Sequence, residues 1–147
     1  NNTNSNIKEG VTAIIYDEMH KPFFLVLKRR LGWEGWEFVK GTINTGETEV
    51  NAVKRKVIEE TGLQKFKIVK KLEGATKEFT DPQNVLNVHS VYLIEASMNI
   101  PIQLPVGESA EHSTYLWTDA ESALSKLTWE NDKDLLMKVI EQLKTNS

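Results

Sequence analysis

Short runs of β-branched and aromatic residues alternate along the chain with segments whose apolar residues recur at helical spacing. Runs of this kind, bounded by turn-forming residues, are typical of strands. Residues 67–72 alternate lysines with apolar side chains, as expected for a half-exposed strand. The pattern predicts strands at Val11–Tyr16, Phe23–Leu27, Lys67–Leu72, Asn87–Ala96 and Thr114–Trp117.

The same pattern predicts three helices. One should run from Thr48 to Thr61. A second should begin at Thr118, because Thr118 and Glu121 have the spacing of a capping box. A third should cover residues 129–143, where leucine, valine and isoleucine recur at helical spacing. Residues 99–107 contain two prolines and are predicted to form a surface loop.

The helix predicted at residues 48–61 carries an apolar stripe and a charged arc. At about 100° per residue, Val50, Val53 and Val57 share the stripe and should face the core. Each acid of the arc lies one turn after a cation, as in ordinary surface ion pairs that contribute only about 0.2–0.5 kcal/mol each. The charges of this helix alone therefore do not identify a site. The opposite arc holds Ala52, Arg55, Lys56, Glu59 and Glu60.

Length and composition narrow the class of protein. The 147 residues suit one domain, predicted over residues 11–147, after an asparagine-rich tail at residues 1–10 that we expect to be disordered. The absence of cysteine excludes disulfides, thiolate metal sites and a cysteine nucleophile. The chain has neither a membrane-spanning apolar run nor a signal peptide, so a cytosolic or nuclear enzyme is expected.

The net charge of −3 argues against a general nucleic-acid binder, which usually has a basic excess. A polyphosphate ligand would then be held by local charge and by metal rather than by the field of the whole molecule. We expect a monomer that acts on a small nucleotide, without membrane or nucleic-acid partners.

Residues 41–63 hold the candidate chemistry. Glu59 and Glu60 are adjacent carboxylates near the end of the predicted helix, and a glycine-containing turn with Glu47 precedes them. An acidic pair on a helix beside exposed backbone N–H groups suits a Mg²⁺-assisted attack on a phosphoanhydride. The spacing resembles the Nudix hydrolase signature at all but one of its fixed positions. The matching residues are Gly41, Glu47, Arg55, Val57, Glu59, Glu60, Gly62 and Leu63.

This resemblance implies an α/β Nudix fold, in which a mixed β-sheet is sandwiched between α-helices. It also implies hydrolysis of a nucleoside diphosphate linked to another group, with Mg²⁺ or Mn²⁺ as cofactor. Glu59 and Glu60 would bind metal, Arg55 would orient the acids, and Glu47 would support the metal site. Gly41 and Gly46 would shape the loop.

Lys56 is the departure from the signature, which has glutamate at this position as a metal ligand. A lysine cannot bind Mg²⁺, and its ammonium would repel a divalent ion close to Glu59 and Glu60. Three explanations are open: a weak hydrolase with its base supplied from elsewhere, a protein that binds nucleotides without cleaving them, and an active enzyme inactivated by exchange of glutamate for lysine.

Segments outside the signature resemble asymmetric diadenosine tetraphosphate hydrolases, which produce ATP and AMP. They are Trp36–Gly41, with Val39 in place of proline, Glu111–Trp117 and Leu127–Asn131. Thr42 stands where many of those enzymes have histidine.

The subfamily resemblance also implies individual roles. Tyr115 would stack on adenine, with Phe79 on the other face of the ring; the alternative for Tyr115 is a half-buried strand aromatic. Lys40, Gly41 and Lys77 would contact phosphate, although Lys77 also fits an ordinary surface lysine. The remaining predictions are Glu111 as a distal metal ligand or base, His89 and His112 as structural residues, Trp36 packed under the loop and Trp33 as an exposed stacking surface.

Other functions fit the same residues. The chain could be a non-catalytic nucleotide-binding Nudix module, in which Lys56 replaces part of the metal charge. It could be a Nudix pyrophosphatase for another nucleoside diphosphate derivative, such as a capped RNA end, an oxidised nucleotide or a nucleotide sugar. A protein-interaction role would need a large exposed apolar patch.

Overall fold

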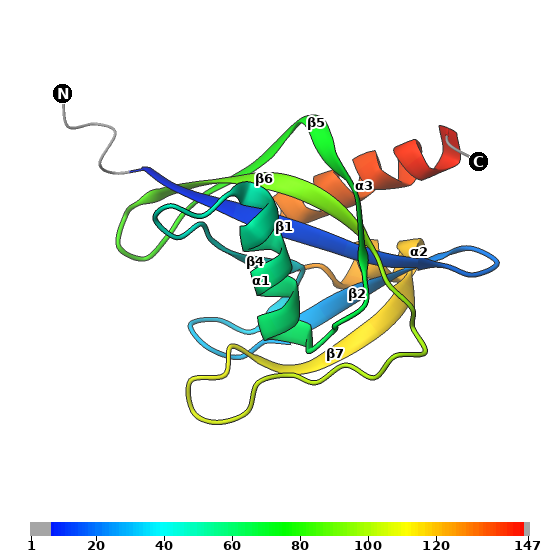
Figure 1. Ribbon diagram of the computed structural model, residues 1–147, viewed down its shortest axis with the longest axis horizontal. Helices are drawn as coiled ribbons and strands as arrows, with labels where there is room; N and C mark the ends of the chain where they lie inside the picture. Colours follow the sequence, from blue (N-terminus) through cyan, green and yellow to red (C-terminus); the bar gives the residue numbers. More distant parts are fainter. Residues whose placement is uncertain (1–6, 146–147) are drawn as a thin grey trace.

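The computed structural model describes residues 7–145 (Figure 1). Within them lie seven strands and three helices. The elements are β1 (Ile7–Glu18), β2 (Pro22–Arg29), β3 (Gly35–Glu37), β4 (Val39–Thr42), α1 (Glu49–Thr61), β5 (Lys67–Thr80), β6 (Leu86–Glu95), β7 (His112–Asp119), α2 (Ala120–Lys126) and α3 (Glu130–Thr145).

The strands form one mixed sheet in the order β3-β2-β1-β6-β5, with β4 paired to β1 and β7 paired to β2. β1 and β6 run parallel along ten residue pairs, from Ile7 opposite Leu86 to Tyr16 opposite Glu95. The other pairings are antiparallel. The long central β1 therefore ties the two halves of the sheet together.

Side chains of β1 alternate between two apolar layers. Ala13 and Ile15 pack with α1 on one face, and Ile14 and Tyr16 pack with α2 and α3 on the other. Figure 1 shows α1 in front of the sheet and α3 behind it. The predicted fold class, a mixed sheet between helices, is confirmed. No helix within residues 7–145 is long and apolar enough to cross a membrane.

Several predicted strand boundaries are wrong. Residues 7–10, predicted as disordered tail, belong to β1 because β6 pairs with them; residues 1–6 lie outside the described part of the chain. β5 continues to Thr80, well beyond the predicted end at Leu72, and a register shift between Lys71 and Thr76 interrupts its pairing with β6. β3 and β4 were not predicted at all, because such short strands carry little periodicity.

Helix α1 has the predicted extent. Thr48 caps its N-terminus by accepting a hydrogen bond from the Asn51 N–H at 3.1 Å. Gly62 ends it in the left-handed region, with φ 74°. The predicted core stripe is partly wrong: Val50 is 40% exposed, whereas Ala52 is fully buried. The buried face of α1 includes Glu60 and excludes Val50, so part of the charged arc faces the sheet.

The two later helices begin slightly beyond their predicted starts. Asp119, rather than Thr118, caps α2 by accepting a hydrogen bond from the Ser122 N–H at 2.9 Å. α3 begins at Glu130, so Trp129 precedes the helix. Residues 99–107 form no helix or strand, which confirms the predicted loop.

Candidate active site

The side chain of Lys56 extends from α1 toward β4, and its aliphatic stem packs against Gly41. A Cβ on Gly41 would meet three Lys56 carbons at 2.4–2.7 Å, so a larger residue at position 41 would displace this stem. The Lys56 ammonium donates to Glu60 Oε2 at 3.1 Å and to Glu59 Oε1 at 3.3 Å. Burial alone would lower the pKa of Lys56, but the Glu60 and Glu59 carboxylates prevail and raise it. Lys56 is therefore a fixed positive charge between the two acids.

Arg55 fixes the loop before α1. Its guanidinium makes two bonds to Glu47, at 2.7 and 2.9 Å, and a third to the Thr42 carbonyl at 2.8 Å. Glu47 also accepts the Asn44 N–H at 2.9 Å. Hydrogen bonds from Arg55 and then from Asn44 lower the pKa of Glu47 to about 2. Arg55 also lies 3.5 Å from Glu59, so one guanidinium positions both acids.

A buried chain of side chains leads away from Glu60. One His112 ring nitrogen lies 3.2 Å from Glu60 Oε1, and the other lies 2.7 Å from Glu37 Oε2. Arg29 donates to the same Glu37 oxygen at 3.3 Å. Burial opposes charge on these groups, but the hydrogen bonds prevail, so the pKa of Glu37 is lowered and that of His112 is raised. Glu60 is thus held ionised between His112 and Lys56.

Glu111 lies at the open side of this cluster. Its side chain is 41% exposed, and its Oε1 is 3.5 Å from Arg29. Candidate ligand atoms of Glu60, Glu111 and His112 lie within 4.8 Å of one another. The fold therefore brings Glu111, which precedes β7, close to Glu60 of α1.

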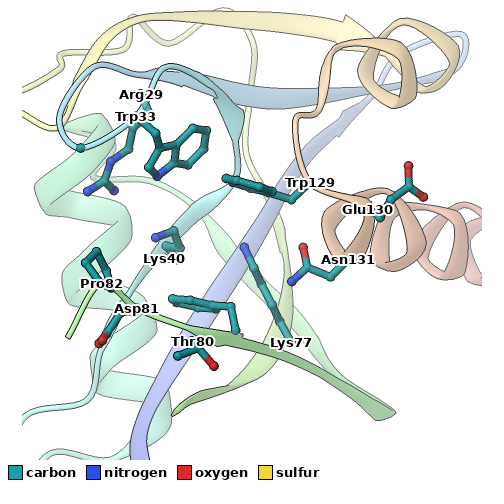
Figure 2. Close-up of a pocket in the computed structure, with 12 residues that line it drawn as sticks. Arg29, Trp33, Lys40, Lys77, Thr80, Asp81, Pro82, Trp129, Glu130 and Asn131 are labelled. Carbon is teal, nitrogen blue, oxygen red and sulfur yellow. The ribbon is translucent and has the colours of Figure 1, made fainter. Parts of the chain in front are cut away.

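An aromatic cavity of about 760 Å³ lies on the other side of Lys40. Figure 2 shows Trp33 and Trp129 side by side, with Lys40 and Lys77 reaching into the space next to them. The two indole rings meet edge to face with centroids 5.0 Å apart. Phe79 also lines the cavity, with the Lys40 ammonium 5.1 Å from its ring centre.

A second, more polar cavity of about 340 Å³ adjoins the first, because Arg29, Lys40 and Phe79 line both. Lys56 and Glu111 are on its wall. Together the two cavities form a groove that leads from the tryptophans to Lys56 and Glu111. We call this the aromatic-to-acid groove.

Comparison with known proteins now assigns the family. The family model of the NUDIX domain matches residues 7–139. The chain belongs to the Nudix hydrolase family. The signature in residues 41–63 is thus part of a domain that occupies nearly the whole chain.

Among solved structures, the chain is similar to a Caenorhabditis elegans Ap4A hydrolase, with a TM-score of 0.79, 22% identity, and coverage of 94% of this chain and 98% of that one. It is also similar to the Escherichia coli dihydroneopterin triphosphate pyrophosphohydrolase, with a TM-score of 0.73, 21% identity, and coverage of 91% and 95%. At these identities the likeness establishes the fold. A curated relative, an RNA pyrophosphohydrolase from Bartonella clarridgeiae, is 28% identical over 58% of this chain and 57% of its own length, so the match spans little more than half of that relative.

Nudix hydrolases use divalent metals, and the carboxylates here are of the type that Mg²⁺ prefers. Their present arrangement does not fit such an ion. Both Glu60 oxygens already have partners, His112 and Lys56, and both His112 nitrogens face carboxylates. The Lys56 ammonium lies where it would repel a divalent cation. Glu47, predicted to support a metal, has both oxygens bonded to Arg55.

The aromatic residues expected to bind the base do not all line the same cavity. Tyr115 is 39% exposed on β7 and lines neither cavity, so Tyr115 and Phe79 do not face each other across one pocket. Trp33 and Trp129 stand near Phe79 instead. Trp36 packs against the core layer of α2 and α3.

Lys77 is not a surface lysine. Its side chain is 3% exposed and its ammonium lies 2.8 Å from Asp132 Oδ1, which is fully buried. His89 is buried and neutral: burial, followed by the charges of Lys77 and Lys40, lowers its pKa to about 3. This agrees with the predicted structural role of His89.

The sequence pattern did not predict Glu37, Arg29 or Trp129 as site residues. Glu37 lies between the apolar Trp36 and Phe38, and Arg29 ends β2 between Lys28 and Arg30, so both look like solvent-facing strand residues. A usable signal for Glu37 was its place inside the Trp36–Gly41 segment, where it could have been considered together with Lys40.

Proposed function

We propose that the chain binds a nucleoside polyphosphate along the aromatic-to-acid groove, and that it is a Nudix pyrophosphohydrolase whose turnover is suppressed by Lys56. The observation that carries this proposal is the continuity of the groove. An aromatic cavity suited to a base adjoins a cationic cavity suited to phosphates, and the wall of the second cavity includes Glu111 and Lys56, whose ammonium contacts the signature acids Glu59 and Glu60.

The aromatic end supports binding of a base. Trp33, Trp129 and Phe79 offer flat apolar surfaces, and stacking of one base on an aromatic side chain contributes about 1–3 kcal/mol. The cavity volume of about 760 Å³ is within the usual range for small-molecule sites. Lys40, at the junction of the two cavities, would contact the first phosphate.

The polar end supports binding of phosphates and attack by water. Arg29, Lys40 and Lys56 line it and can donate to phosphate oxygens. Glu111, at the open side of the acids, can accept the proton of an attacking water. Glu59, held by Arg55, is a second candidate for this step.

Among substrates, we propose a dinucleoside polyphosphate, with diadenosine tetraphosphate cleaved to ATP and AMP. The support is the resemblance of three segments to asymmetric hydrolases of this compound and the similarity of the fold to an Ap4A hydrolase. The name of the curated relative makes the 5′ end of RNA the main competing substrate. The net charge of −3 favours the smaller ligand.

The test compares this chain with its Lys56→Glu variant, which restores the acid of the family signature. Diadenosine tetraphosphate, ADP-ribose and 5′-triphosphate RNA are incubated with each protein and Mg²⁺ or Mn²⁺, and the products are resolved by chromatography. We expect slow or no cleavage by this chain and a gain of at least ~10²-fold in the variant, the scale of one positioned acid–base group.

Equal amounts of ATP and AMP would support the asymmetric cut. A faster reaction on 5′-triphosphate RNA would replace the proposed substrate. Failure of both proteins to cleave any of the three compounds would contradict the assignment of pyrophosphohydrolase activity. Equal rates for the two proteins would show that Lys56 does not suppress turnover.

A further inference from the structure

The Lys56 ammonium would repel a divalent metal from the acids, and it also brings a positive charge to the same place. The following inference rests on the proposed function. We infer that the Lys56 ammonium stands in for the divalent cation of the site, so that this chain binds nucleoside polyphosphates without metal. The ligand class is a nucleotide with two or more linked phosphates, held as the metal-free anion.

The position of Lys56 is the first support. Its ammonium is held by the two signature acids, at 3.1 and 3.3 Å, and its side chain is only 13% exposed. The stem is fixed by its packing on Gly41. An ammonium has three donors, and two of them are used by Glu60 and Glu59, which leaves one for a phosphate oxygen. Because Lys56 lines the polar cavity, a ligand there can reach it.

Charge is the second support. Exchanging glutamate for lysine at this position changes the local charge from −1 to +1, the same change as adding one divalent ion. With glutamate, the acids around the polar cavity would repel a polyphosphate unless a metal were bound. With Lys56, the cavity already has four cationic side chains on its wall: Arg29, Lys40, Arg55 and Lys56.

The alternatives elsewhere in the groove are less able to supply this charge. Arg55 is already bonded to Glu47 and Thr42, and Lys77 is paired with buried Asp132. Arg29 contacts Glu37 and Glu111. Lys56 is thus the cation that directly contacts both signature acids, Glu59 and Glu60.

The experiment is isothermal titration calorimetry of the full chain with ATP and with diadenosine tetraphosphate, in EDTA and in Mg²⁺. We expect similar dissociation constants in the two buffers. Lys56→Met keeps the stem against Gly41 but removes the charge, and should weaken binding in EDTA by at least ~10-fold, the scale of one hydrogen bond to a charged group. Lys56→Glu should bind only when Mg²⁺ is present.

Two further variants keep the result interpretable. Lys54→Met, at an exposed position of the same helix, is the matched control and should bind like the parent chain. Lys56→Arg keeps the charge and should keep binding in EDTA. Circular dichroism melts verify that each variant is folded, so that lost binding is not lost structure.

The outcomes separate this inference from the proposed function. Binding by the parent chain in Mg²⁺ but not in EDTA would overturn the inference while leaving the nucleotide site in place. Binding in EDTA that survives Lys56→Met would also overturn it, because another cation would then hold the phosphates. No binding of either nucleotide in either buffer would overturn the proposed function and this inference with it.

Discussion

Two lysines that look alike in the sequence have opposite surroundings in the fold. Lys56 lines a cavity, and its ammonium contacts Glu59 and Glu60. Lys77 is buried, and its ammonium lies 2.8 Å from Asp132 Oδ1. Neither Asp132 oxygen has a well-directed hydrogen bond, and burial raises the pKa of this carboxyl group. Lys77 therefore contributes mainly to stability, and Lys56 mainly to the chemistry of the groove.

Replacing Lys77 by methionine should destabilise the fold by about 3–5 kcal/mol, because it leaves a buried charge uncompensated. The double variant Lys77→Met/Asp132→Leu removes both charges and should recover most of that loss. Urea denaturation followed by circular dichroism measures both values. A loss below ~1 kcal/mol in the single variant would contradict the buried ion pair.

The two candidate base-stacking positions can be separated by one pair of variants. Trp33→Ala should weaken nucleotide binding by about 1–3 kcal/mol, the contribution of one stacked base. Tyr115→Ala should leave it unchanged, because Tyr115 lines neither cavity. Titration calorimetry with diadenosine tetraphosphate measures both. The reverse order of effects would favour the clamp that the sequence resemblance implied.

At the scale of elements, α1 joins the signature to the sheet. Its caps, Thr48 and Gly62, are visible in the sequence, so its extent could be predicted. Its orientation could not, because three valines suggested one buried stripe while the packing buries Ala52, Val53, Val57 and Glu60. When apolar, small and charged residues are spread around a helix, their spacing alone does not show which face packs against the sheet.

The N-cap of α1 gives a direct test of this element. Thr48→Ala removes the acceptor for the Asn51 N–H and should lower the free energy of unfolding by about 1 kcal/mol. Thr45→Ala, at an exposed position of the preceding turn, is the matched control and should change it by less than ~0.5 kcal/mol. Equal losses in the two variants would show that the Thr48 hydroxyl has no capping role.

At the scale of the whole molecule, the site is assembled from segments far apart in the chain. Trp33 meets Trp129, Lys77 meets Asp132, and His112 links Glu37 of β3 to Glu60 of α1. The resemblance to the Nudix signature predicted the fold and pointed to the acids and Arg55 as candidate site residues. These long-range pairs could not be predicted, because hydrophobic periodicity describes one element at a time and contains no information on which distant side chains meet.

Stability should depend on pH through buried His89, whose hydroxyl partner is Thr12 at 2.9 Å. Its pKa is lowered from 6.5 to about 3 in the fold, so its contribution is fully present above pH 6.5 and is lost as the pH falls toward 3. The unfolded chain binds the proton first, which gives a slope of at most about 1.4 kcal/mol per pH unit from this group. Urea denaturation at several pH values, with His89→Gln for comparison, measures the slope. A variant with the same slope as the parent would contradict this assignment.

Mn²⁺ binding measured by electron paramagnetic resonance would show whether the Lys56 ammonium occupies the place of the metal. Free Mn²⁺ gives a sharp signal that is lost when the ion binds protein. We expect this chain to leave the signal of added Mn²⁺ nearly unchanged, whereas the Lys56→Glu variant should reduce the signal in proportion to the protein added. Binding of Mn²⁺ by this chain as tightly as by the Lys56→Glu variant would show that Lys56 does not take the place of the metal.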